Sequence, residues 1–218
     1  MSVSQTNETA RVEAFSDGVF SIVITLLAFN LRVPTLDSTG DGSLLVQLVA
    51  NWPVYLSFFA SFGFILVMWL NHHRLFSLIS VCDTGLMILN GLLLLGVTVV
   101  PFTTQLVAEY INVSQGKEAA AVFFVWFVLI ALLFNGLWWY AVRTNNLFDA
   151  SSNPALVQHI ARQYSLGPIM YFSLLIISLI NVPIGVIGSL VPMIFFALPN
   201  RTIQNYFEEQ EEKNKLVS

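Results

Sequence analysis

The chain has very little charge and almost no cysteine. Of its 218 residues only 10% are charged and 56% are hydrophobic, whereas a soluble domain carries about 25% charged residues. The single cysteine, Cys82, excludes an internal disulfide. Nine basic residues against thirteen acidic ones do not form the basic face that nucleic-acid binding requires. These deficits indicate an integral membrane protein without a nucleic-acid partner.

The beginning of the chain also lacks a feature. The segment MSVSQTNETA has no basic stretch of the kind that opens a cleaved signal peptide. We therefore expect the first apolar segment to remain in the mature protein. The sequence shows no internal repeat either, and such repeats are typical of many secondary transporters.

Long apolar runs stand where the charges are missing. A helix needs about 20 apolar residues to cross hydrocarbon. The last run would be about 50 Å long as one helix at 1.5 Å per residue, so we divide it at the turn-like segment Asn181-Val-Pro-Ile-Gly185. This gives an all-α, polytopic membrane protein with six transmembrane helices: Val12–Leu31, Leu44–Leu70, Leu86–Leu106, Ala119–Val142 and the two halves of Leu166–Leu198.

The distribution of basic residues predicts the orientation of these spans. With a cytoplasmic N-terminus, seven of the nine basic residues fall on the cytoplasmic side and only Arg32 and Lys117 lie outside. This is the positive-inside bias, and five spans would weaken it. We therefore expect both termini in the cytoplasm of a bacterial cell membrane, with a six-helix domain over residues 1–199 and a polar tail over 200–218.

The first apolar segment carries charge only at its entrance. Arg11, Glu13 and Asp17 lie in its first two turns, and the residues after Asp17 are nearly all aliphatic. Ionised groups at the edge of hydrocarbon are costly and usually have a task. A charged entrance followed by an aliphatic stripe is what a pore-lining helix with a hydrophobic constriction needs.

A helical wheel at about 100° per residue separates this segment into two faces. Asp17 and Glu13 fall on one side, so Asp17 should point into the protein and need a partner there. The opposite face combines apolar side chains with one threonine: Phe15, Val19, Ile22, Thr25, Leu26 and Phe29. Contact with lipid or with another helix is the alternative role for such a face, since membrane helices in general have one.

A polar run, Trp69-Leu-Asn-His-His-Arg-Leu-Phe76, ends the second span. The topology brings His72 and His73 to the depth of Arg11 and Asp17, where an Arg–Asp–His hydrogen-bond network would satisfy these groups. The alternative is an ordinary interfacial cap with snorkelling side chains. We expect no resident metal, because adjacent histidines on a helix point about 100° apart.

Two motifs, Arg11-x-x-x-Phe15-Ser16-Asp17 and Asn71-His72-His73-Arg74, resemble the prokaryotic branch of the transmembrane protein 175 potassium channels. Together they cover the first third of the chain. The resemblance implies a homotetramer in membrane lipid, with the first helices around a central axis and no re-entrant filter loop. The chain has no Thr-Val-Gly-Tyr-Gly segment, in agreement with that architecture. Permeant potassium would be the only metal, and no cofactor is implied.

The resemblance also assigns roles by position. It places the narrowest constriction at Ile22, further apolar pore layers at Leu26 and Phe29, and potassium preference at Thr25. Phe29 is larger than the leucine that the resemblance leads one to expect there. One of the two histidines, left open between His72 and His73, would join the signature residues in a buried structural network off the pore axis: Arg11, Phe15, Ser16, Asp17.

These expectations describe a cation channel with modest selectivity for potassium over sodium. A proton- or solute-coupled secondary transporter is the competing interpretation, since an aspartate beside histidines suits protonation near neutral pH. A membrane enzyme is not expected, because Ser16 and Cys82 lack a base-and-orienter set and the motifs of known hydrolases are absent. A scaffolding membrane protein is compatible with the same residues.

Overall fold

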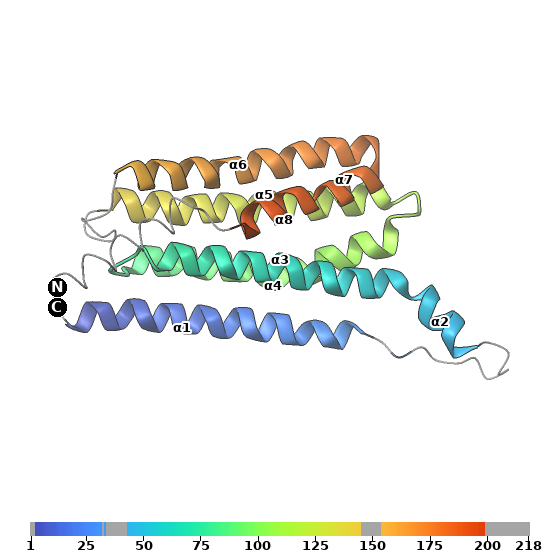
Figure 1. Cartoon of the computed structure of the whole chain (residues 1–218), viewed down its shortest axis with the longest axis horizontal. Coiled ribbons are helices and arrows are strands. Elements are labelled where there is room, and N and C mark those ends of the chain that lie inside the picture. Colours follow the sequence, from blue (N-terminus) through green and yellow to red (C-terminus); the bar gives the residue numbers. More distant parts are fainter. Residues whose placement is uncertain (1–2, 32, 34–42, 145–153, 199–218) are drawn as a thin grey trace.

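The computed structural model describes residues 3–31, 33, 43–144 and 154–198. Regular structure in these residues is entirely helical, which confirms the expected all-α class: α1 (Val3–Leu26), the 3₁₀ helix η1 (Leu27–Asn30), α2 (Leu44–Ala50), α3 (Trp52–Phe76), α4 (Thr84–Tyr110), α5 (Gly116–Arg143), α6 (Pro154–Ile180), α7 (Val182–Gly188) and α8 (Leu190–Ala197). Figure 1 shows the long helices running alongside one another, with α1 at one edge and α6 at the other. The predicted tail, 200–218, lies outside the described residues.

Five of the described helices are long and apolar enough to cross a membrane: Glu8–Asn30, Trp52–Phe76, Thr84–Tyr110, Gly116–Arg143 and Val157–Ile180. They correspond to the first five predicted spans. A sixth apolar stretch, Val182–Ala197, is shorter and consists of α7 and α8. These helices agree with the integral membrane protein predicted from composition. The sixth crossing stays a prediction.

The second predicted span, Leu44–Leu70, was wrong in its boundaries. The chain leaves helical geometry at Asn51, so that Leu44–Ala50 forms the separate helix α2 and the long helix α3 starts at Trp52. Pro53 lies in the first turn of α3, where its fixed φ and missing N–H favour the start of a helix. At the other end α3 continues to Phe76, so the His72–His73 run lies inside its last turns.

The last apolar block breaks at the predicted place. The Asn181 side chain accepts a hydrogen bond from the Ile184 backbone N–H at 3.1 Å and caps α7. From there the chain folds back (Figure 1), with α7 against α5 and α6, and α8 against α3 and α6. The predicted start of the fifth span at Leu166 was too late, because α6 begins at Pro154. Polar residues in its second and third turns lower the hydropathy without preventing helix formation: Gln158, His159, Arg162 and Gln163.

Pro168 removes a backbone hydrogen bond from α6, and a side chain of a neighbouring helix replaces it. Pro168 in α6 has no N–H for the carbonyl of Tyr164. The Asn135 side chain of α5 donates to that carbonyl at 2.8 Å and to the Ala131 carbonyl at 2.8 Å. Membrane helices tolerate proline where neighbours satisfy the freed backbone in this way. The Trp126 indole N–H of α5 also donates to α4, to the Gly96 carbonyl at 2.9 Å, but the carbonyl that Pro101 leaves without an N–H is that of Val97.

Replacing Asn135 with alanine should lower the stability of the bundle by about 1 kcal/mol, the scale of an interhelical polar contact in a membrane. The Tyr164 carbonyl would then lose the donor that stands in for the missing N–H of Pro168. The measurement is thermal unfolding in detergent, with Asn112→Ala as the control because Asn112 is exposed in the α4–α5 connection. Equal midpoints for the two variants would contradict this role of Asn135.

Candidate functional site

Helix α1 divides into a buried and an exposed face. The buried face consists of Ser16, Phe20, Val23 and Leu27, each at most 8% exposed. Their spacing of three and four residues follows the helical period, and this face contacts α3 and α4. The rest of α1 lies at the edge of the bundle (Figure 1), where its own chain leaves it uncovered.

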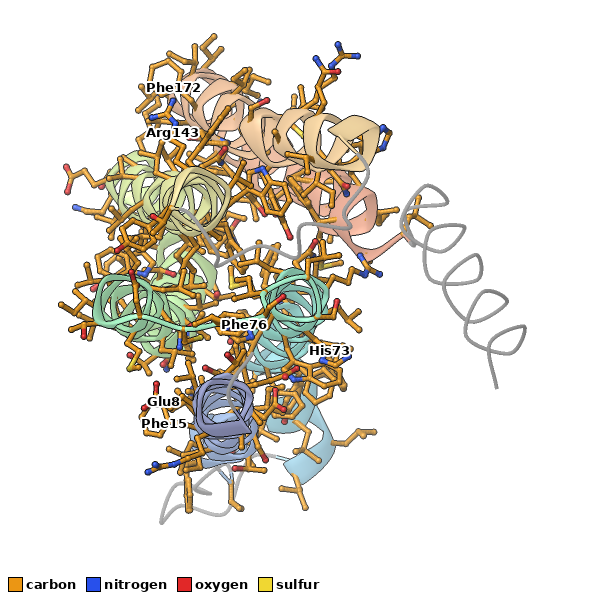
Figure 2. The ribbon with its side chains drawn as sticks, turned by 90° about the vertical axis from the view of Figure 1, so that its left-hand side faces the viewer. Glu8, Phe15, His73, Phe76, Arg143 and Phe172 are labelled. Carbon is orange, nitrogen blue, oxygen red and sulfur yellow. The ribbon has the colours of Figure 1, made fainter. Side chains whose placement is uncertain are left out.

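Large apolar side chains occupy the uncovered side of α1. Phe15, Ile22, Leu26 and Phe29 are 65%, 58%, 51% and 78% exposed, respectively, and Thr25 is exposed between them. Figure 2 looks along the helices and places Phe15 on the opposite side of α1 from His73 of α3. The stripe that the helical wheel selected is thus the side of α1 that the folded chain turns away from its own core.

The Thr25 hydroxyl is satisfied within its own helix. Its oxygen lies 3.0 Å from the Ser21 carbonyl oxygen and 2.9 Å from the Ile22 carbonyl oxygen, so the hydroxyl hydrogen bonds there. The lone pairs of the Thr25 oxygen remain free to face an approaching cation or water. Thr25 is therefore a hydroxyl set among the exposed apolar side chains of this stripe.

A buried relay joins α1, α3 and α4 on the opposite face. The Asn90 amide nitrogen donates to Ser16 Oγ at 2.9 Å, and Ser16 in turn donates to the Val12 carbonyl at 2.8 Å. Asn90 Oδ1 then faces His72 Nε2 at 2.9 Å, so His72 must donate from Nε2. Ser16, His72 and Asn90 are at most 2% exposed. The relay fixes the depth of α1 against its neighbours.

Two further contacts join α1 to α3 near the same end. The Trp69 indole N–H donates to Asp17 Oδ1 at 2.8 Å, and His73 Nδ1 lies 3.0 Å from Glu13 Oε1. Asp17 therefore has its partner inside the subunit. Each contact lies about one helical turn from the other, so both helices are held in register.

The structure divides the expected Arg–Asp–His network into separate contacts. His72 turns toward α4 and reaches Ser16 through Asn90, while His73 turns toward α1 and meets Glu13, as the divergence of neighbouring helical residues requires. Arg11 and Phe15 are exposed, and in the part of the chain that the structure describes no hydrogen bond joins Arg11 to Asp17. Arg11 and Phe15 line an open hollow beside Met87 and Gly91 of α4.

Sequence reasoning missed Asn90. It is the one amide in the middle of the apolar segment Leu86–Leu95, and a polar group at that depth needs a partner. That signal was available, but its partners, Ser16 and His72, are distant in sequence. Glu13 and Trp69 were noted in the sequence without a site role, and the structure gives both a specific partner.

The other side of the same turns of α3 holds the end of α8. The Arg74 guanidinium donates to the carbonyls of Phe196 and Ala197 at 3.1 and 3.2 Å, and the Asn71 amide donates to Phe196 at 3.0 Å. A cation suits the negative C-terminal end of a helix. The end of α8 therefore lies at the same end of the bundle as Glu13 and His73.

Beyond Asp17, the uncovered side of α1 is an uncharged, largely apolar surface. Within the described ranges, no group of three or more histidine, cysteine, aspartate or glutamate side chains could hold a metal ion. The buried relay is structural, and the exposed side of α1 is uncharged from Val19 to Phe29. A narrow aliphatic wall can act as a barrier to ions through dewetting, provided that further chains complete it.

Comparison with known proteins gives consistent matches. The sequence profile of the family described as endosomal/lysosomal potassium channel TMEM175 matches residues 11–101, which include most of α1, all of α3 and the relay. A potassium channel of Chamaesiphon minutus is 44% identical over 192 residues, covering 88% of this chain and 95% of that protein. A potassium channel of Streptomyces collinus is 43% identical over 166 residues, covering 76% of this chain and 80% of that protein.

A solved structure has the same fold. The crystal structure of a lysosomal potassium-selective channel TMEM175 homolog from Chamaesiphon minutus matches with a TM-score of 0.76 at 43% identity, over 88% of this chain and 97% of that chain. The human endosomal/lysosomal proton channel TMEM175 is 37% identical over 101 residues, which is 44% of this chain and 20% of the human protein. The bacterial matches extend over most of both chains, whereas the human match covers only a fifth of the human protein.

Proposed function

This chain belongs to the TMEM175 family of ion channels, and from that premise we propose that four copies form a potassium-permeable pore lined by their α1 helices. One observation carries the proposal: α1 buries Ser16, Phe20, Val23 and Leu27 in its own bundle while Ile22 is 58% exposed on the uncovered side. In a lone subunit this stripe would face lipid, whereas in a ring of four it would surround a central axis.

The proposed passage has one constriction and one polar layer. Four Ile22 side chains form a neck that dewets, so that ions pass when the α1 helices tilt or rotate apart. Thr25 supplies oxygen ligands one turn further along, with Leu26 and Phe29 as apolar layers beyond it. Selectivity for potassium over sodium is modest, because a single threonine layer replaces only part of the hydration shell.

The proposed topology has six crossings, with α7 and α8 together as the sixth. Residues Val182–Ala197 extend about 24 Å at 1.5 Å per residue, which suffices with local thinning of the bilayer. Two observations support this return: Arg74 holds the end of α8 beside the last turns of α3, and the same turns contact the first half of α1. In this topology both termini of the chain are cytoplasmic, in agreement with the positive-inside bias of the sequence.

Single-channel recording in planar bilayers tests the proposal. With potassium on one side and sodium on the other, we expect unitary currents whose reversal potential favours potassium, without a requirement for a pH gradient. Transport that saturates and depends on a proton gradient, in the absence of unitary currents, would favour a coupled carrier instead. Recording with a pH gradient and impermeant ions measures proton permeation separately, which matters because the matched vertebrate relatives are named proton channels.

Replacing Thr25 with valine should lower the potassium-to-sodium permeability ratio by about two- to fivefold, equivalent to roughly 0.4–1 kcal/mol. Valine keeps the shape of threonine but removes the oxygen ligand. Ser173→Ala is the control, since Ser173 is also exposed, also bonds a carbonyl of its own helix, that of Ile169 at 2.8 Å, and lies on α6 at the opposite edge of the bundle from α1 (Figure 1). A ratio that is unchanged in Thr25→Val moves selectivity away from this layer.

A further inference from the structure

A second feature lies away from α1, at the end of the bundle where α3 begins. A cavity of about 140 Å³ separates the first half of α3 from α7, with α4 and α5 behind it. Helix α7 contacts α5 and α6, whereas α8, after Ser189, contacts α3 and α6. The cavity lies where α7 faces α3 without packing closely against it.

The inside of the cavity is apolar and has no free polar group. The hydroxyls of Ser57, Thr104 and Ser189 line it, but each donates to a carbonyl of its own helix, those of Val54, Val100 and Val186. None of the lining residues is charged. A water molecule needs two to four polar partners to be stable in such a site. Cavities of this size with apolar walls stay dry and accept apolar guests.

The cavity is open at one side, and the residues at its mouth are the exposed ones. Leu56 is 55% exposed on α3 and Ile187 is 66% exposed on α7, whereas Phe64 and Phe123 at the inner wall are 4% and 2% exposed. Trp52, half-exposed at the first turn of α3, also lies at the mouth. Tryptophan is typical of the level of lipid headgroups. The mouth is therefore continuous with the hydrocarbon-facing surface of a membrane-spanning bundle.

We propose that this cavity is a binding site for one acyl chain of a membrane phospholipid. The chain enters between α3 and α7 below the level of Trp52 and fills the space in front of Phe64 and Phe123. Recognition is of the hydrocarbon alone, because the site offers no charge and no free donor to a headgroup. The bound chain supplies the packing that α7 and α3 do not supply to each other, so it holds the short α7–α8 segment against the bundle.

Photolabelling in proteoliposomes tests the site directly. The probe is a phosphatidylcholine with a diazirine on one acyl chain, irradiated with the full-length protein and mapped by peptide mass spectrometry. We expect adducts on the inner-wall residues Thr104 and Phe123, which line this cavity, as well as at the mouth. Inner-wall residues do not face bulk lipid, so their labelling requires a chain inside the cavity. Mapping the unaltered protein needs no variant to fold.

A filled-site variant gives the matched comparison. Ala60 lines the cavity on α3, and Ala60→Phe should reduce inner-wall labelling severalfold. Val122→Phe adds a ring at a residue that is 45% exposed on α5 and does not line the cavity, so it should leave labelling unchanged. The thermal midpoint in detergent should rise on adding phosphatidylcholine for the unaltered protein and for Val122→Phe, and rise less for Ala60→Phe.

Two outcomes would overturn the proposal. Adducts confined to mouth residues such as Trp52 and Ile187 would show that no chain enters. Cross-links between copies of the protein through this cavity, obtained with a photoreactive residue at Leu56, would show that a second subunit fills it. Neither outcome bears on ion conduction, which bilayer recording measures separately.

Discussion

Replacing Ile22 with alanine should raise the unitary potassium conductance several-fold, and should raise it more than substitution of any other apolar residue on α1. Truncation removes three carbon atoms from each of the four side chains that would form the neck, which widens it and favours its wetting. If the barrier to ion passage falls by about 1 kcal/mol, the rate rises about fivefold. The measurement is single-channel current in planar bilayers under symmetrical potassium.

Ile169→Ala is the control for this experiment. Ile169 on α6 is 61% exposed and Ile22 is 58% exposed, so both substitutions remove the same atoms from comparably exposed sites in the isolated subunit. They differ in position, because α1 and α6 lie at opposite edges of the bundle (Figure 1). Equal conductance of Ile22→Ala, Ile169→Ala and the unaltered protein would remove Ile22 from the constriction.

The exposed stripe of α1 was predictable from the sequence because it depends only on local geometry. Helical periodicity places Phe15, Ile22 and Phe29 on one side whatever the rest of the chain does, and their exposure in the fold agrees with that placement. The break at Asn181 was predictable for the same reason, since its cap and the following proline are adjacent in sequence. Local signals of this kind do not depend on which helices become neighbours.

The partners of the polar groups were not predictable in the same way. The sequence indicated that Asp17 and the histidines needed partners, but not that Trp69 serves Asp17 or that Asn90 stands between Ser16 and His72. These pairs depend on the relative rotation and depth of α1, α3 and α4. Likewise, the boundary error at Leu44–Leu70 arose because hydropathy reports how apolar a segment is and does not report that a new helix starts at Trp52.

Replacing Asn90 with leucine should produce the largest loss of stability among single substitutions in the relay. Leucine has nearly the same size, so the change removes hydrogen bonds without opening a large cavity. It leaves the Nε2–H of His72 buried without an acceptor, and an unsatisfied buried donor costs about 1–3 kcal/mol. For a chain of this length each 1 kcal/mol lowers the midpoint by roughly 2–4 °C. Thermal unfolding in detergent measures the shift.

A second substitution separates the lost hydrogen bond from a packing defect. His72 is stacked on Phe76 with ring centroids 4.3 Å apart and lies 5.4 Å from the Phe20 ring, so phenylalanine fits its place, and its Nδ1 has no partner to lose within the described residues. Replacing both members of a buried pair with apolar groups is often nearly neutral. His72→Phe combined with Asn90→Leu should therefore be more stable than Asn90→Leu alone. If the double variant is less stable than the single one, Asn90 holds the three helices together by shape, and the hydrogen-bond explanation is wrong.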